Sequence, residues 1–451
     1  MKKRLAAAAM AGLMLLSLAG CGAGTQVTGA DQEKTAEALC EALREGDFET
    51  AKTYYSSGMK KAVEEETLKT SYLQFDRMTG PLTGEVRLTS QIEQNDQFRS
   101  CFVTEERENG RLLVHVLINQ KNGKVEGLHL NCEPYADLVS NTVFEEVPVT
   151  VGKDSAHPLE GLLALPKGVE KPPVVLLIAG SGPCDRNETL YLNTPMRDIA
   201  HALAEQGIAS LRYDKRFAAY PELAADKAFL PTLEAEVLDD AASAIELLRE
   251  DPRVDGNGIF VLGHSLGGSL TPYFAAEYPF LQGIISVAGT LRPLYELFYD
   301  QNQELGKKLL ETADKKTAKT VEKQLAEIEE DIEVLRGDFT DVKDDEILMG
   351  MQASYQKSLK QYAGEQYIDT VALPVFVLQG GMDFQVFPET DLPKWQAALK
   401  DRDNAWTKVY PQLNHLMMPS DGQRNQQEYL TPGTVDKAVT DDIAAFIKAY
   451  H

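Results

Sequence analysis

The chain has 451 residues, of which 43% are hydrophobic, and this is enough apolar sequence to build a large core and more than one domain. Its 45 Lys and Arg residues stand against 69 Asp and Glu residues, which gives a net charge of −24. This acidic balance excludes nucleic acid and other polyanions as expected partners.

The first 20 residues are typical of a signal peptide that is not part of the fold. Residues 2–4 are basic and precede an apolar stretch, LAAAAMAGLMLLSLA, that is too short to span a membrane comfortably. The stretch ends in LAGC, residues 18–21, which resembles the lipobox of bacterial lipoproteins. The resemblance implies that Cys21 is lipidated and anchors the protein to the extracytoplasmic face of a bacterial cell membrane. The alternative is an ordinary cleaved signal with an accidental cysteine.

After a polar linker, residues 21–32, the pattern predicts a small α+β domain over residues 33–135. Apolar residues at helical spacing come first, and three strand-like runs separated by Asn-Gly turns follow: FRSCFVTEE, RLLVHVLIN and KVEGLHL. This order resembles the cystatin-like or nuclear-transport-factor-like modules of bacterial lipoproteins. The cysteines at positions 40, 101, 132 and 184 could form disulfides in an oxidising compartment, but the sequence does not assign pairs.

Residues 142–451 alternate between strands and helices, which predicts an α/β domain with a mostly parallel sheet covered on both faces. The expected strands are VFEEVPVTV, LEGLLALP, PVVLLIAG, IASLRYD, IFVL, GIISVAG, PVFVLQG and WTKVYP. In such sheets, active residues lie beyond the carboxyl ends of the strands.

The stretch GIFVLGHSLGGSL, residues 258–270, predicts a nucleophile elbow. A buried strand leads into Ser265, and a helix begins at once. Gly263 and Gly267 are needed because a Cβ at either position would collide with the neighbouring strand or helix. The alternative is a serine that only caps the helix. The side chain of His264 is expected to point away from the serine and to be structural.

A serine nucleophile needs a base, and the base needs a carboxylate that fixes its tautomer. His415 lies just past the last expected strand, in VYPQLNHLMMP, and Asp383 lies just past the strand before it, in VFVLQGGMDFQV. The order Ser265, Asp383, His415 is the order of an α/β-hydrolase triad. A packing role for His415 and a turn-forming role for Asp383 are the alternatives.

The oxyanion of the reaction needs two backbone N–H donors. One is expected from Leu266, the residue after the nucleophile, and the other from Ser181 in the loop AGSGPCDRNET, with Gly182 as the alternative. No Cys-x-x-Cys motif and no His/Cys cluster has the spacing of metal ligands, so the sequence predicts neither a metal nor a cofactor.

At this point the chain resembles an α/β-hydrolase of the bacterial esterase and serine-aminopeptidase-like branch. The motifs GSGPCDRNE, LRYDKR, GHSLGG, LQGGMDFQV and LNHLM carry the resemblance over about two thirds of the chain. It implies a serine hydrolase that cleaves a small-molecule carboxylic ester through an acyl-enzyme. The chain departs from the pattern of this branch at two positions of one loop. Ala179 stands where many relatives have a histidine, and Cys184 lies in the same loop, so the resemblance does not fix the geometry of the acyl pocket.

Between two of the strands lies an insertion rich in charged helix formers, at about residues 291–369. It is expected to form a helical cap above Ser265 and to contribute little to the core of the sheet.

Two other functions stay open at this stage. One is an amidase or aminopeptidase, because the same triad serves both reactions, and the other is a binding lipoprotein without catalysis. The sequence does not indicate an oligomeric state.

Overall fold

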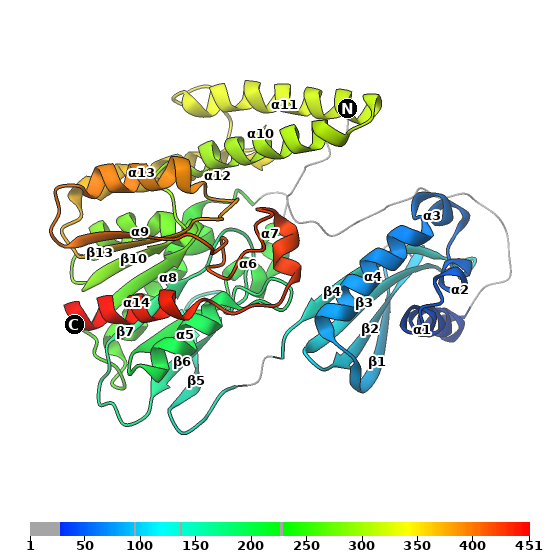
Figure 1. Ribbon diagram of the computed structural model, residues 1–451, viewed down its shortest axis with the longest axis horizontal. Helices are drawn as coiled ribbons and strands as arrows, with labels where there is room; N and C mark the ends of the chain where they lie inside the picture. Colours follow the sequence, from blue (N-terminus) through cyan, green and yellow to red (C-terminus); the bar gives the residue numbers. More distant parts are fainter. Residues whose placement is uncertain (1–27, 94–95, 136–137, 226–228) are drawn as a thin grey trace.

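The structure is a computed structural model that describes residues 28–93, 96–135, 138–225 and 229–451 (Figure 1). The predicted signal peptide, residues 1–20, and its Cys21 lie outside the described residues. Within these ranges, no helix combines the length and the apolar character needed to cross a bilayer.

The N-terminal unit packs helices on one face of a four-stranded antiparallel sheet with the strand order β1-β2-β3-β4. Its elements are α1 Gly29–Arg44, α2 Phe48–Thr53, α3 Ser57–Ala62, α4 Glu65–Thr79, β1 Leu82–Ile92, β2 Phe98–Arg107, β3 Gly110–Asn119 and β4 Val125–Glu133. Strands β2, β3 and β4 are expected from the sequence, whereas α4 and β1 are not. Strand β1 is exposed along most of its length, so it lacks the alternation of buried and partly buried residues that β3 has.

The second unit is built on an eight-stranded sheet with the order β14-β13-β10-β9-β7-β8-β6-β5. Its strands are β5 Phe144–Val151, β6 Leu159–Pro166, β7 Val174–Ile178, β8 Ala209–Tyr213, β9 Ile259–His264, β10 Gly283–Val287, β13 Val375–Gly380 and β14 Ala405–Tyr410. Strands β14, β13, β10, β9, β7 and β8 pair in parallel, whereas β6 pairs antiparallel with both β8 and β5. The mostly parallel α/β sheet predicted from the sequence is confirmed.

Helices cover both faces of this sheet because its central strands are apolar on both sides. The helices of this unit are α5 Pro195–Glu205, α6 Arg216–Ala219, α7 Pro221–Ala225, the π-helix η1 Glu234–Leu238, α8 Asp239–Glu250, α9 Leu266–Glu277, α13 Pro388–Leu399, the 3₁₀ helix η4 Gln426–Leu430 and α14 Lys437–Tyr450. In β9, Ile259 and Val261 face the core beneath α8, α9 and α13, while Phe260 and Leu262 face the core beneath α5 and α14.

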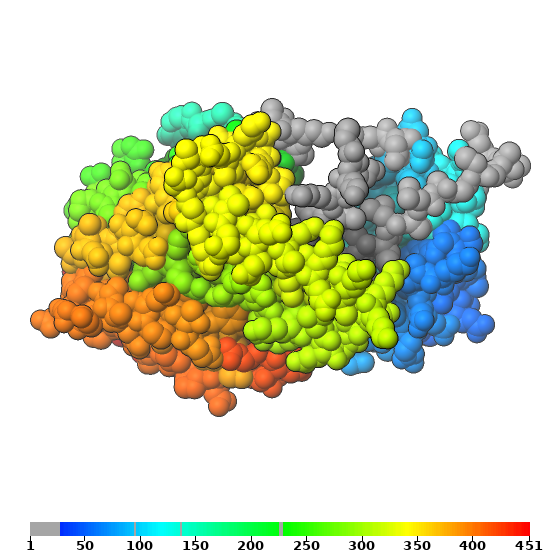
Figure 2. All heavy atoms as spheres, turned by 90° about the horizontal axis from the view of Figure 1, so that it is seen from above, coloured from blue at the N-terminus to red at the C-terminus, as the bar shows by residue number. Residues whose placement is uncertain are grey.

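The insertion between β10 and β13 is helical, as predicted. It comprises α10 Leu294–Thr312, α11 Lys315–Arg336, the short strands β11 Ile347–Leu348 and β12 Met351–Gln352, α12 Ala353–Gln361 and the 3₁₀ turns η2 Gly364–Gln366 and η3 Ile368–Thr370. Figure 2 shows the insertion, in yellow, with the C-terminal segments in orange on one side and the N-terminal unit in blue on the other.

The two ends of the insertion belong to the core of the sheet, which is more than the sequence predicts. Leu294 and Leu297 of α10, Leu359 of α12 and Ile368 of η3 share one buried cluster with the strands. α11 and the distal part of α10 contribute no residue to this cluster, but the two ends of the insertion do, so the expectation that the whole insertion contributes little to the core is wrong.

The N-terminal unit contacts the loops that follow β7 and β14. Phe75 of α4 packs edge-on against Tyr191, with ring centroids 6.0 Å apart, and Met78 of the same helix lies in a cluster with Leu192 and Leu430. These loops leave the carboxyl ends of parallel strands, so the N-terminal unit lies at the edge of the sheet where active residues are expected.

Candidate active site

Ser265 occupies a sharp turn between β9 and α9. Its φ of 54° and ψ of −115° place a residue with a Cβ in a strained region, and such strain persists only where the surroundings impose it. The turn is tight, because a Cβ at Gly263 would lie 2.0 Å from the carbonyl oxygen of Gly267. A Cβ at Gly267 would lie 2.3 Å from that of Ile178. These approaches are the reason that the sequence has glycine at both positions.

His415 and Asp383 meet in the loops that follow β14 and β13. The Nδ1 of His415 lies 2.8 Å from Oδ2 of Asp383, and both side chains are buried. The other contacts of the carboxylate are all with donors: the N–H groups of Gln385 and Val386, at 2.8 and 2.9 Å, and Nε2 of Gln379, at 3.0 Å. An oxygen surrounded by donors is stabilised as a carboxylate, so Nδ1 of His415 carries the proton and Nε2 is left as an acceptor.

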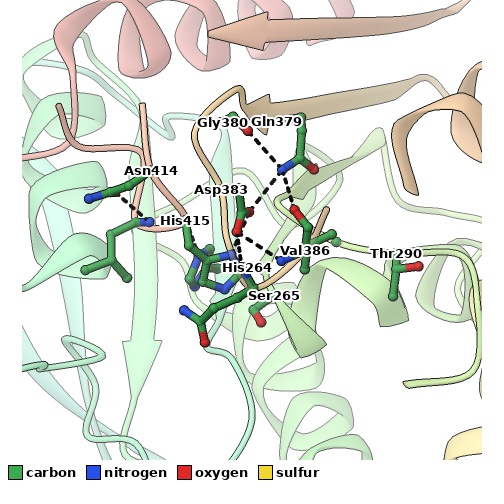
Figure 3. Close-up of polar contacts among 12 residues, drawn as sticks. His264, Ser265, Thr290, Gln379, Gly380, Asp383, Val386, Asn414 and His415 are labelled. Carbon is green, nitrogen blue, oxygen red and sulfur yellow. Dashed lines mark hydrogen bonds and ion pairs between the residues drawn. The ribbon is translucent and has the colours of Figure 1, made fainter. Parts of the chain in front are cut away.

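The loop of His415 lies against the turn of Ser265. His264 directly precedes the serine, and its ring centroid is 4.7 Å from that of His415. Figure 3 shows the two imidazole rings between Asp383 and Ser265. The structure therefore brings together the three residues that the sequence selects from distant segments.

The side chain of His264, expected to point away from Ser265 and to be structural, is buried and hydrogen-bonded to neighbouring loops. Its Nδ1 lies 2.9 and 3.0 Å from the two oxygens of Glu188, and its Nε2 lies 2.9 Å from the carbonyl oxygen of His415. The strained turn at Ser265 directs the preceding side chain toward the loop after β14. A pattern of residue types does not reveal that direction.

The loop after β7 holds the residues expected to bind the oxyanion. The N–H of Gly182 donates to Oε1 of Glu236 at 3.0 Å, so Gly182 is not a free donor. Within the described part of the chain, the N–H groups of Ser181 and Leu266 have no acceptor. Ser181 is exposed, and Leu266 begins α9, where unpaired N–H groups and the positive end of the helix dipole favour negative charge.

Glu236 contacts the loop after β7 through a buried network of hydrogen bonds. Its Oε1 accepts from Nζ of Lys215 at 2.6 Å, and Lys215 also donates to the carbonyl oxygen of Gly180 at 2.7 Å. Its Oε2 accepts from the hydroxyl of Tyr355 in α12 at 2.6 Å. Burial alone would lower the pKa of Lys215, but the Glu236 carboxylate outweighs it and the pKa is raised. Glu236 is not among the residues expected from the sequence, because its only signal there is a carboxylate at an apolar position of the expected helix.

Other polar residues of the motifs form ion pairs around the site. Asp214 accepts two hydrogen bonds from the Arg186 guanidinium, at 2.6 and 3.0 Å. Burial raises the pKa of the Cys184 thiol to about 12, so this cysteine is not a thiolate nucleophile at neutral pH.

None of the four described cysteines is in a disulfide. Over the described ranges, no three His, Cys, Asp or Glu side chains lie together as a set of metal ligands.

Comparisons with known proteins agree with the fold. The family model described as serine aminopeptidase, S33, matches residues 194–421. Esterase EstD of Thermotoga maritima is 34% identical over 332 residues, which cover 72% of this chain and 74% of the relative. The solved structure of Est1E from Butyrivibrio proteoclasticus has a TM-score of 0.43 and 17% identity over 67% of this chain and 98% of its own. Dipeptidyl peptidase 4 of Porphyromonas gingivalis has a TM-score of 0.43 and 14% identity, and it matches 82% of this chain over 44% of its own length.

Proposed function

Because the chain belongs to the serine aminopeptidase S33 family of α/β-hydrolases, we propose that it is a carboxylesterase whose triad is Ser265, His415 and Asp383. The contact that carries this proposal is the 2.8 Å pair between His415 Nδ1 and the buried Asp383 carboxylate, at the turn that presents Ser265. The pair leaves the other ring nitrogen free to accept a proton.

In the proposed reaction, Nε2 of His415 takes the hydroxyl proton of Ser265 as the oxygen attacks the carbonyl carbon of the ester. The tetrahedral intermediate collapses, the alcohol leaves with the proton from His415, and an acyl-enzyme remains. Water, deprotonated by the same nitrogen, then attacks the acyl-enzyme, and the acid and free Ser265 are released. Asp383 stays ionised and stabilises the imidazolium.

The N–H groups of Leu266 and Ser181 bind the oxyanion of both tetrahedral intermediates. Losing one such donor typically lowers kcat by about 10²- to 10³-fold. Two carboxylates already accept the N–H groups of the residues on either side of Ser181, at 2.7 Å from Gly180 and 3.0 Å from Gly182. Of these three consecutive residues, Ser181 is therefore the one whose N–H has no acceptor in the described part of the chain.

An amidase of the same mechanism is the second candidate, since the family model that matches the chain is described as an aminopeptidase. The relative that matches most of the chain is described as an esterase, which favours ester cleavage.

Hydrolysis of p-nitrophenyl esters with graded acyl chains and of aminoacyl p-nitroanilides separates the candidates. We expect ester turnover that the Ser265→Ala variant lacks. Turnover of the anilides with a kcat/KM above that of every ester would support the amidase instead. Ester turnover by Ser265→Ala equal to that of the parent would contradict the triad.

A further inference from the structure

The proposed mechanism leaves two polar side chains beside the triad without a role, one partly buried and one buried. Glu188 lies in the loop after β7, and His264 is the last residue of β9. Their side chains are 12% and 4% exposed. Glu188 has a φ of 53°, a strained conformation for a glutamate, and strain of this kind is retained where surrounding contacts fix the residue.

This pair joins three parts of the site. Oε1 of Glu188 accepts the N–H of Gly180 at 2.7 Å, and a Cβ at Gly180 would lie 3.2 Å from that of Ser265. The same carboxylate contacts Nδ1 of His264, whose Nε2 contacts the carbonyl oxygen of His415 at 2.9 Å. One chain of hydrogen bonds therefore runs from the oxyanion loop, through the residue before the nucleophile, to the backbone of the general base.

Both ring nitrogens of His264 face oxygen atoms that only accept hydrogen bonds, a carboxylate and a carbonyl. Each nitrogen must carry a proton to make its contact, so the ring is an imidazolium. Burial by itself would lower the pKa of His264, but the Glu188 charge and the two hydrogen bonds outweigh burial, and the pKa is raised.

We propose that Glu188 and His264 are positioning residues. They fix the positions of the His415 backbone and of the oxyanion loop relative to Ser265. The inference rests on the proposed triad and adds a second carboxylate–histidine pair to it. This pair acts through backbone contacts and takes no part in proton transfer. A displacement of about 1 Å in such a site can cost about 100-fold in rate, which is the scale of effect that a positioning pair controls.

The pair predicts a loss of activity at high pH. The titratable groups around His264 are Glu188, Asp383 and His415, from the loops after β7, β13 and β14, and Tyr429 interacts in turn with Glu188 and Asp383. When pH rises through the raised pKa of His264, the ring loses one proton and with it one of its two contacts. The kcat of the parent enzyme should therefore fall at alkaline pH.

Three substitutions separate positioning from charge. His264→Phe keeps the ring packing and removes both hydrogen bonds, so we expect kcat to fall by about 10- to 100-fold with KM nearly unchanged. Glu188→Gln can accept from Gly180 through its oxygen and donate to a neutral His264 through its nitrogen. It should keep kcat within about threefold at pH 7 and lose the alkaline decline, whereas Glu188→Ala should be as slow as His264→Phe.

His201→Phe is the matched control, because His201 forms a contact of the same kind with Glu146, at 2.7 Å, between α5 and β5. It should lower thermal stability without changing kcat or its pH profile. Two results would overturn the proposal: a His264→Phe enzyme with the parent's kcat and pH profile, or a Glu188→Gln enzyme as slow as Glu188→Ala. If His264→Phe does not fold, the two Glu188 variants still decide. Ser265→Ala, assayed in parallel, tests the triad separately, since only failure of the triad would leave that variant active.

Discussion

Replacing Asp383 by asparagine tests the geometry of the proposed triad. The side chain is fully buried, and one of its oxygens accepts two backbone N–H groups, from Gln385 and Val386. The amide oxygen of the asparagine must take that position, so its NH₂ group faces His415 and the amide of Gln379. His415 can then pair only by accepting at Nδ1, which moves its proton to Nε2 and leaves no base for Ser265.

The expected loss in kcat is about 10³- to 10⁴-fold, which corresponds to about 4 to 5 kcal/mol of transition-state stabilisation. KM should change little, because the carboxylate does not contact substrate. Stability should also fall by about 1–3 kcal/mol, since the NH₂ group of the introduced asparagine then faces that of Gln379 in a buried site. Steady-state kinetics on a p-nitrophenyl ester and urea unfolding measure the two effects separately.

Asp391 offers the matched control, because this carboxylate is equally buried but pairs with Arg292 and Thr290 and not with His415. Asp391→Asn should lose comparable stability and keep kcat within a few-fold. If Asp383→Asn kept a near-normal kcat, another carboxylate would orient His415 and the reasoning would be wrong.

The remaining predictions concern the surroundings of the site. Tyr355→Phe removes a hydrogen bond to Glu236 and should lower kcat by about three- to tenfold; unchanged kinetics would show that α12 does not support the oxyanion loop. Cys184, with a pKa of about 12, should resist iodoacetamide at pH 8 in the folded protein, and rapid alkylation detected by mass spectrometry would refute this. Replacing residues 304–327, the outer part of the α10–α11 hairpin, by a Gly/Ser linker should leave a folded esterase with weaker acyl-chain selectivity, and an unchanged chain-length profile would exclude the hairpin from the binding site. Cys21→Ala should move the protein from the membrane fraction to the soluble fraction, because the proposed lipid is its anchor; unchanged fractionation would refute the lipobox.

The sequence predicts the parts of the fold in which one local pattern has one structural meaning. Continuous apolar runs such as residues 259–262 can only be strands buried on both faces when helices alternate with them. The glycines around Ser265 and the positions of Asp383 and His415 after successive strands suffice to select the triad candidates, because the carboxyl ends of parallel strands share one edge.

Other features depend on contacts between distant segments, and their local pattern is ambiguous. Glu236 lies in a stretch that is typical of an ordinary α-helix, whereas the structure has a π-helix there, and this turn places the carboxylate under the oxyanion loop. His264 is a single polar residue at the end of a buried strand, and its partners come from loops 76 and 151 residues away. The two ends of the insertion join the core through Leu294 and Ile368, which resemble any apolar residues of a charged helix.

Reaction with a fluorophosphonate probe, followed by peptide mass spectrometry, tests the proposed nucleophile most directly, since only a serine activated by a base reacts appreciably with such a probe. We expect one adduct per chain, on the peptide that carries Ser265, with loss of ester hydrolysis in proportion to labelling and no adduct in the Ser265→Ala variant. An adduct on a different serine, or full labelling of Ser265→Ala, would contradict the assignment of Ser265 as the nucleophile.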